Sequence, residues 1–143
     1  MSEHKSFQFT IPGQPMGWKR AGKNKWTGAT FDPKENQDYK KRVRDYAFEA
    51  GIRDEPHAGP VCLTVTAYLQ RPKKFFRQKD QDGPIHCTSK PDLDNIVKLI
   101  EDAMNKYVYR DDAQVCYVTL GKFYCEKSGR PRTEISIELL PEE

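Results

Sequence analysis

The chain has 143 residues, of which 36% are hydrophobic and 31% charged, and its formal net charge is +3. This length predicts one domain spanning residues 1–143, and an aromatic content of 11% argues against a disordered chain. No stretch approaches the roughly 20 apolar residues of a membrane-spanning helix, and residues 1–10 lack the apolar core of a signal peptide. We therefore expect a soluble, cytoplasmic protein with no membrane partner.

The four cysteines, Cys62, Cys87, Cys116 and Cys125, show no metal-binding or redox spacing. Three of them fall in stretches with the composition of strands, where a reduced thiol behaves as a small apolar side chain. We expect all four to be reduced. The three histidines show no ligand spacing either, and we assign them no role.

The first half of the chain predicts a strand, a loop and a helix. Residues 7–12 alternate apolar and polar side chains, which is typical of a strand. Residues 13–31 contain turn-forming residues, two tryptophans and four cations, and we expect a loop there. A helix should follow, with Asp32 as its N-cap, Glu35 completing a capping box and Gly51 as its stop signal.

The second half predicts a strand at residues 61–69, a long basic loop at 71–91, a second helix, and strands at 114–125 and 133–140. The second helix carries one apolar stripe, formed by Ile96, Leu99, Ile100, Ala103, Met104 and Tyr107. The resulting order is β-α-β-α-β-β. It predicts an α+β domain in which a mixed sheet of about four strands packs with two main helices.

Cations gather in three segments that acids rarely interrupt, residues 19–25, 40–44 and 71–79. Such segments are either solvated loops or a surface that holds a polyanion. Because acidic residues cluster elsewhere in the chain, we favour a nucleic-acid surface. The predicted DNA contacts are Lys19, Arg20, Lys73, Lys74, Arg77 and Lys90.

Four aromatic residues lie within or beside these basic segments: Trp18, Trp26, Phe75 and Phe76. They would either stack on unpaired bases or pack their loops onto the domain. For the two tryptophans both interpretations stay open. For the adjacent pair Phe75 and Phe76, which lies between cations, we favour a wedge that opens DNA.

Two acidic pairs stand out, Asp92 with Asp94 at the start of the second helix and Asp111 with Asp112 before a strand. In one interpretation they stabilise the helix dipole and form a polar turn. In the other, helix–sheet packing brings Asp112 toward Asp92 and Asp94, where the carboxylates would repel one another without a cation. All-oxygen ligation indicates Mg²⁺ or Mn²⁺. Lys98, on the same helix face as Asp94, would neutralise charge on a phosphate.

The stretch KPDLDNIVKLIEDAMN, followed by DDAQV, resembles the RusA family of Holliday-junction resolvases, the crossover junction endodeoxyribonucleases. The shared pattern is D-x-D-N, a lysine three residues after the asparagine, a D-A helix end, and D-D-x-Q-V before a strand. It extends to Lys122 and covers about residues 90–122. Pro91 departs from the pattern, because some relatives have a basic residue there.

This resemblance implies a homodimeric α+β enzyme that uses Mg²⁺, with Mn²⁺ as a substitute, to nick four-way junctions in branched DNA. The implied catalytic residues are Asp92, Asp94, Lys98 and Asp112, of which the three acids are the implied metal ligands. Asp111 would be an accessory acid, and Asn95 would orient Asp92 or cap the helix. A DNA-binding module without catalysis and a Mg²⁺ nuclease for other branched DNA are the alternative interpretations.

Overall fold

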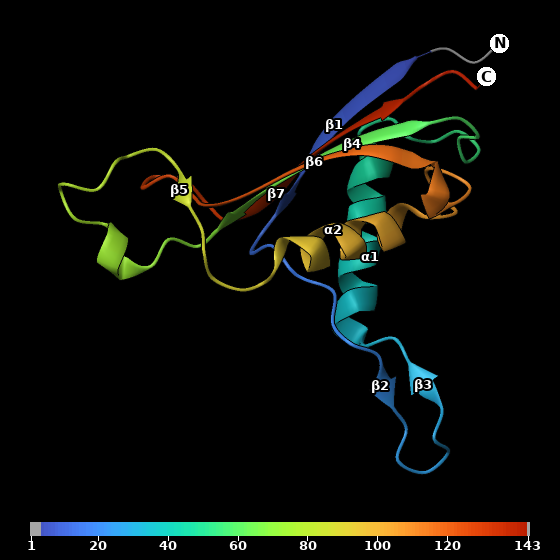
Figure 1. The fold of residues 1–143 in the computed structure, drawn as a ribbon, viewed down its shortest axis with the longest axis horizontal. Coiled ribbons are helices and arrows are strands. Elements are labelled where there is room, and N and C mark those ends of the chain that lie inside the picture. Colours follow the sequence, from blue (N-terminus) through green and yellow to red (C-terminus); the bar gives the residue numbers. More distant parts are fainter. Residues whose placement is uncertain (1–3, 143) are drawn as a thin grey trace.

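A five-stranded mixed sheet forms the centre of the protein (Figure 1), with the strand order β1-β7-β4-β6-β5. The computed structural model describes residues 4–142, so the predicted domain ends at 1 and 143 lie outside the described residues. The strands are β1 (Lys5–Pro12), β4 (Val61–Leu69), β5 (Ile85–His86), β6 (Val115–Tyr124) and β7 (Arg132–Leu139). Strands β4 and β6 run parallel, and the other neighbouring pairs are antiparallel. The α+β prediction is confirmed, with β5 as an additional strand.

Helices α1 (Lys34–Glu49) and α2 (Leu93–Met104) cover the same face of the sheet and cross each other there (Figure 1). The core lies between these helices and the sheet, where the predicted apolar face of β4 is fully buried. The stripe on α2 is confirmed for five of its six residues: Ile96, Leu99, Ile100, Ala103 and Met104. Tyr107 was predicted wrongly, because α2 ends at Met104 and the Tyr107 side chain is exposed.

The start of α1 differs from the prediction. The helix begins at Lys34, and no side chain caps its first turn, so the expected capping box with Asp32 is wrong. The Asp32 carboxylate instead forms an ion pair with Lys40, at 2.7 Å, and accepts a hydrogen bond from Asn36 Nδ2, at 3.0 Å. The predicted end is confirmed, because Gly51 follows the helix with a φ of +108°, which favours glycine.

Two segments predicted as loops contain regular structure. Strands β2 (Gly22–Lys23) and β3 (Thr30–Phe31) pair as an antiparallel hairpin, and we call residues 20–31 the hairpin arm. It extends away from the sheet and helices (Figure 1). Residues 71–91, the long loop, contain the short 3₁₀ helix η1 (Lys73–Phe75) and β5. The four cysteines are free, as expected. No helix within residues 4–142 is long and apolar enough to cross a membrane.

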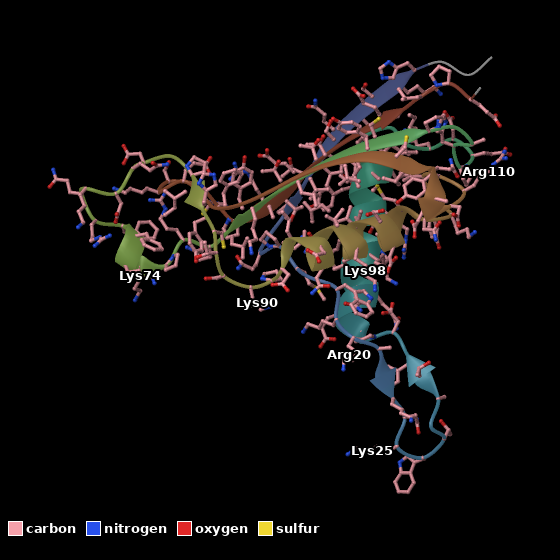
Figure 2. All side chains as sticks on the ribbon, viewed as in Figure 1. Arg20, Lys25, Lys74, Lys90, Lys98 and Arg110 are labelled. Atoms are coloured by element: carbon pink, nitrogen blue, oxygen red, sulfur yellow. The ribbon has the colours of Figure 1, made fainter. Side chains whose placement is uncertain are left out.

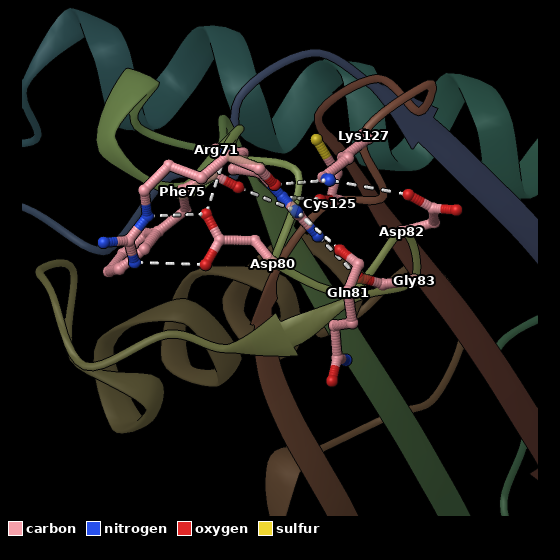
Figure 3. A network of polar contacts seen from close by, with 9 residues as sticks. Arg71, Phe75, Asp80, Gln81, Asp82, Gly83, Cys125 and Lys127 are labelled. Carbon is pink, nitrogen blue, oxygen red and sulfur yellow. Dashed lines mark hydrogen bonds and ion pairs between the residues drawn. The ribbon is translucent and has the colours of Figure 1, made fainter.

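Arg71 anchors the long loop from inside (Figure 3). Its side chain is 2% exposed. The guanidinium donates to the carbonyl oxygens of Phe75, Gln81 and Cys125 at 2.9–3.0 Å and also to that of Gly83. A buried arginine needs such partners, because an unpaired charge in the core is costly. Arg71 belongs to the basic segment 71–79, but this burial excludes it from a DNA-binding surface.

Candidate active site

The acidic side chains at the start of α2 face solvent. Asp92 occupies the N-cap position, but its carboxylate makes no cap hydrogen bond. It accepts a hydrogen bond from Lys90 Nζ at 2.8 Å, and its side chain is 53% exposed. The hydrogen bond from Lys90 is the main cause that lowers the pKa of Asp92, and the charge of Lys122 adds to the effect. Because Asp94 is also exposed in the first turn, both carboxylates are accessible to a ligand.

A lysine from β6 positions the segment that leads into α2. Lys122 Nζ donates to the carbonyl oxygens of Ser89, at 2.6 Å, and Pro91, at 3.0 Å. The Ser89 hydroxyl also lies 2.7 Å from the hydroxyl of Tyr124 on the same strand. The segment before Asp92 is therefore attached at two points to the end of β6, which sets where α2 begins. The sequence pattern included Lys122 without indicating this role.

Lys98 lies against an aromatic ring, and it forms no ion pair within residues 4–142. Its Nζ is 3.7 Å from the centroid of the Trp18 ring, a cation–π contact. Trp18 donates its backbone N–H to the Asn95 carbonyl oxygen at 2.8 Å. Gly17 packs closely on Pro91, because a Cβ added at Gly17 would lie only 2.8 Å from the Cβ of Pro91. These contacts hold the chain before the hairpin arm against the first turn of α2, beside a cleft of about 420 Å³ that Asp92 helps to line.

The two accessory candidates are placed differently. Asp111 caps η2 (Asp112–Gln114), because its carboxylate accepts from the Ala113 N–H at 2.9 Å. Gln114 Oε1 accepts in return from the Asp111 N–H at 2.8 Å, which completes a capping box. Asp111 therefore has the polar-turn role that the sequence allowed for it. The Asn95 side chain makes no hydrogen bond among the described residues, so neither of its two expected contacts is formed.

Asp112 lies half-buried near the last turn of α2. Its Oδ1 is buried and has no hydrogen-bond partner in the described part of the chain. Burial, followed by the charge of Asp102, raises the pKa of Asp112, and the Tyr109 hydroxyl partly offsets this. Burial likewise raises the pKa of Glu101, with Asp112 and Asp102 adding to the effect. Carboxylates that gather in this way repel one another, and a bound cation would relieve the repulsion.

The two acidic groups therefore lie at opposite ends of α2. Asp92 directly precedes the helix, whereas Asp112 interacts with Asp102 in its last turn. The 12 residues of the helix span about 18 Å. Figure 2 shows Lys90 before the start of α2 and Arg110 beyond its far end. The predicted convergence of the three metal ligands within one chain is wrong, and no group of three or more His, Cys, Asp or Glu among the described residues could hold a metal ion.

The six predicted DNA contacts are all exposed. Lys19, Arg20, Lys73 and Lys74 form no ion pair within residues 4–142. Arg77 pairs with Asp80 at 3.1 Å, and Lys90 pairs with Asp92. In Figure 2, Lys74, Lys90 and Arg20 lie along the lower side of the molecule, where Lys98 also lies. These cations therefore share a side with the start of α2.

The cations of the basic segment 40–44 all make contacts within the chain. Each of its cations has a partner within the chain: Lys40 with Asp32, Lys41 with Asp45, Arg42 with the Pro12 carbonyl oxygen, and Arg44 with the Tyr107 ring. Contact of this segment with phosphates stays a prediction, because such exposed partners can exchange for a phosphate.

The aromatic candidates divide into packed and exposed residues. Trp18 packs against α2 as described above, and the Phe75 ring lies 5.7 Å from that of Tyr124 at the edge of the core. Phe76 is 43% exposed, whereas Trp26 is 95% exposed. A wedge formed by Phe75 and Phe76 together is therefore wrong. Trp26 is instead the aromatic residue most accessible to a base. The turn-forming Asn, Thr and Gly residues around it in the sequence could have indicated that it lies at an exposed turn.

A surface of exposed carboxylates beside cationic loops on a small α+β domain is typical of enzymes that act on nucleic acid. The family model described as Endodeoxyribonuclease RusA matches residues 12–138. The chain belongs to this family of endodeoxyribonucleases, which confirms the resemblance seen around α2.

Two relatives cover nearly the whole chain. The uncharacterized protein YqaN of Bacillus subtilis (strain 168) is 32% identical over 140 residues, which are 91% of this chain and 94% of YqaN. The crossover junction endodeoxyribonuclease rusA of Lactococcus phage r1t is 28% identical over 141 residues, 92% of this chain and 95% of its own length. The similarity therefore extends far beyond the motif that first indicated it.

Proposed function

We propose that this endodeoxyribonuclease resolves four-way DNA junctions by paired symmetric nicks that depend on Mg²⁺, and that it acts as a homodimer in the cytoplasm in DNA recombination and repair. The observation that carries the proposal is the division of the family's acidic motif between the two ends of α2, because one chain then holds two incomplete half-sites. The similarity to the crossover junction endodeoxyribonuclease of the phage supports the substrate. The exposed cations of the hairpin arm and the long loop support a polyanionic partner.

A free strand edge supports the dimer. On the side of β6 away from β4, β5 pairs only with the end of the strand, at Phe123 and Tyr124. Over residues 115–121 this edge has no strand partner in the described part of the chain. The stretch contains no charged residue, and Tyr117 and Val118 are exposed on it. Because an unprotected edge pairs readily with another strand, we assign this edge to β6 of a second copy, in antiparallel orientation.

Such pairing would complete both half-sites. β6 begins shortly after Asp112, and its other end carries Lys122, which holds the segment before Asp92. In an antiparallel pair, the start of one strand lies beside the end of the other. Asp112 of one copy would then approach Asp92 and Asp94 of the partner subunit. A two-fold axis would generate two identical sites, one for each of the two strands that a junction requires to be cut.

The residues fit a hard divalent cation. The unpartnered buried oxygen of Asp112 and the raised pKa values around it are the features that a cation would relieve. Asp92 and Asp94 from one copy, with Asp112 from the other, would hold Mg²⁺ through oxygen alone, and Mn²⁺ would substitute. When bound, this ion would polarise the scissile phosphate and lower the pKa of a water.

The remaining roles follow from position. Lys98, held on the Trp18 ring four residues after Asp94, would offset negative charge on the reacting phosphate. Lys90 lies beside Asp92 and would contact the neighbouring phosphate. The cations Lys19, Arg20, Lys73, Lys74 and Arg77 would hold the duplex arms through phosphates, so affinity should fall steeply with salt and show little sequence preference.

Cleavage of defined substrates tests the substrate class. A labelled four-way junction, a Y-fork and a linear duplex of the same sequence are each incubated with the protein in Mg²⁺ or in EDTA. We expect symmetric nicks in the junction alone, and only with Mg²⁺. Binding of the junction without any cleavage would instead identify a DNA-binding module, and cleavage of the Y-fork alone would identify a nuclease for other branched DNA.

Mixing two inactive variants tests the shared site. Asp92→Asn and Asp112→Asn subunits are each purified, and then exchanged with each other before junction is added. If the site is shared, a mixed dimer has one site with both substitutions and one intact site, so nicking of a single strand should return. If each site lay within one chain, no mixture would recover activity. Asp92→Asn mixed with Asp94→Asn is the matched control, which should remain inactive because both changes lie in the same half-site.

A further inference from the structure

Trp26 lies at the tip of the hairpin arm with 95% of its surface exposed, the largest exposed fraction among the large hydrophobic residues of the described chain. The arm extends well away from the sheet, with Lys25 labelled beside its tip (Figure 2). A single exposed apolar side chain is ordinary on a protein surface. An exposed indole at the end of a protruding hairpin is different, because it cannot reach the core and so does not stabilise the fold by packing.

The tip is held in one shape by local hydrogen bonds. Asn24 Oδ1 accepts from the backbone N–H groups of Trp26, at 2.8 Å, and Thr27, at 3.0 Å. The Gly28 N–H donates to the Asn24 carbonyl oxygen at 2.9 Å, and the Asn24 N–H donates to the Ala29 carbonyl oxygen at 2.8 Å. Gly28 has a φ of +73°, which glycine adopts without strain. The backbone that carries Trp26 is therefore ordered before any partner binds, which lowers the entropic cost of binding.

The base of the arm is fixed as well. Asn36 on α1 is fully buried, and its amide exchanges hydrogen bonds with the backbone of Lys19 and donates to Asp32 at 3.0 Å. Lys19 precedes the arm and Asp32 follows it, so one side chain holds both ends together. The neighbouring residue Trp18 contacts the first turn of α2. The arm is thus mounted on α1 and on the first turn of α2, the helix that Asp92 directly precedes.

The arm and the segment before it carry only positive charge. Between residues 13 and 31 the chain contains Lys19, Arg20, Lys23 and Lys25 and no acid. None of these four cations forms an ion pair within residues 4–142. A partner for this surface should therefore be negatively charged and should also offer a flat face to an indole. DNA offers both, in its phosphates and in the faces of its bases.

We propose that the hairpin arm is a DNA-sensing element in which Trp26 stacks on the exposed face of a base at the branch point, while Lys23 and Lys25 contact the flanking phosphates. The inference rests on the proposed function, since it assumes that branched DNA occupies the neighbouring site. A base inside a continuous duplex is already stacked on both faces, whereas a base at a branch point exposes one face. Stacking by Trp26 therefore favours branched DNA over duplex.

Binding and fluorescence test this role. Junction affinity is measured in EDTA for the wild type, Trp26→Ala, Trp26→Phe and the control Phe48→Ala, which removes another exposed aromatic ring on α1. Loss of one stacking contact should weaken junction binding by Trp26→Ala about 5- to 150-fold, with a much smaller effect on duplex binding. Trp26→Phe should retain most of the affinity, and Phe48→Ala should match the wild type. A junction with 2-aminopurine at the branch point should change its fluorescence with the wild type and not with Trp26→Ala.

The outcomes separate this inference from the proposed function. If Trp26→Ala binds and cuts the junction like the wild type, the arm has no sensing role while the resolvase stands. If the wild type neither binds nor cuts branched DNA, the proposed function itself fails. If Trp26→Ala instead loses the dimer in light scattering, the arm holds a second copy and the DNA contact is wrong. An unchanged melting curve for Trp26→Ala, expected for so exposed a residue, ties any loss of binding to the contact itself.

Discussion

An aspartate lies beside each end of α2, and the two have opposite electrostatic settings. At the start, Asp92 is exposed, pairs with Lys90 and has a lowered pKa. At the end, Asp112 is half-buried beside Glu101 and Asp102 and has a raised pKa. The first group is satisfied by a neighbouring lysine, whereas the second leaves a buried oxygen that has no partner within residues 4–142.

Because of this difference, a substitution can change the stability of the fold and the rate of cleavage independently. A carboxylate that is neutralised by a neighbouring lysine can be replaced with little effect on folding. A carboxylate held among like charges destabilises the metal-free fold, and a bound cation stabilises the fold most at such a site. Both are needed for the proposed chemistry, so the same substitution at the two ends should be equally harmful to activity and different in its effect on stability.

The largest expected effect is on cleavage. Asp92→Asn and Asp112→Asn should each slow junction cleavage by about 10³-fold or more, because each removes an anionic ligand from the proposed ion, an effect worth about 4 kcal/mol. Junction binding in EDTA should stay within a few-fold of the wild type. Single-turnover cleavage and gel-shift titration measure the two quantities. Asp111→Asn is the matched control, since Asn also caps helices, and near-normal cleavage is expected from it.

Lys98→Ala should lower the cleavage rate by about 10²-fold, the usual effect of removing one group that stabilises a developing charge. Because Lys98 packs on Trp18 and not on an acid, the fold should be preserved, which circular dichroism can check. Lys41→Ala, on α1 and paired with Asp45, serves as the control for loss of one positive charge. Equal cleavage by the two variants would remove Lys98 from the mechanism.

The comparison predicts opposite stability effects in EDTA. Asp112→Asn should raise the melting temperature by about 2–4 °C, the shift that a gain on the order of 1 kcal/mol causes in a domain of this size. The neutral amide avoids the repulsion from Asp102 and can donate a hydrogen bond. Asp92→Asn should leave the melting temperature unchanged or lower it slightly, because an exposed ion pair contributes little to stability. A lowered melting temperature for Asp112→Asn would mean that the carboxylate is a structural anchor.

The smallest effect concerns pH. A carboxyl group whose pKa is raised on folding contributes stability that is present below its unfolded value, 3.8 for Asp112, and is lost as pH rises through the folded pKa. The melting-temperature advantage of Asp112→Asn in EDTA should therefore be near zero at about pH 4 and grow toward neutral pH. For Asp92 the sign is reversed, because its pKa is lowered. Thermal melts at both pH values, repeated with Mg²⁺, measure the difference.

Sequence periodicity predicted most of the core correctly. The alternation in β4 and the apolar stripe of α2 identified side chains that are buried in the structure, because burial demands a repeat of two in a strand and 3.6 in a helix. The reduced cysteines and the α+β order followed from spacing and composition. Asp32 was wrongly predicted as an N-cap. Its carboxylate contacts the side chains of Lys40 and Asn36 further along the helix, and the capping-box pattern does not include these positions.

The hairpin arm and the anchor of the long loop escaped prediction for a different reason. Strands β2 and β3 have two residues each, too few to show any alternation. Arg71 looked like one more cation of a basic loop, and its burial depends on carbonyl oxygens gathered from Phe75, Gln81, Gly83 and Cys125. Nothing in its sequence neighbours marks an arginine that faces inward.

The residue types of the site and the elements that hold them could be predicted from the sequence, because motif residues and hydrophobic periods are local properties of the chain. The position of Asp112 by the last turn of α2 became visible only in the folded chain. Residues 105–111 join the helix to η2, and they turn at its end, where the N–H groups of Tyr107 and Val108 both donate to the Met104 carbonyl oxygen. Asp112 therefore stays beside the last turn. That geometry divides the acids between two ends of one helix, and in the proposed dimer a second copy of the chain supplies the missing half.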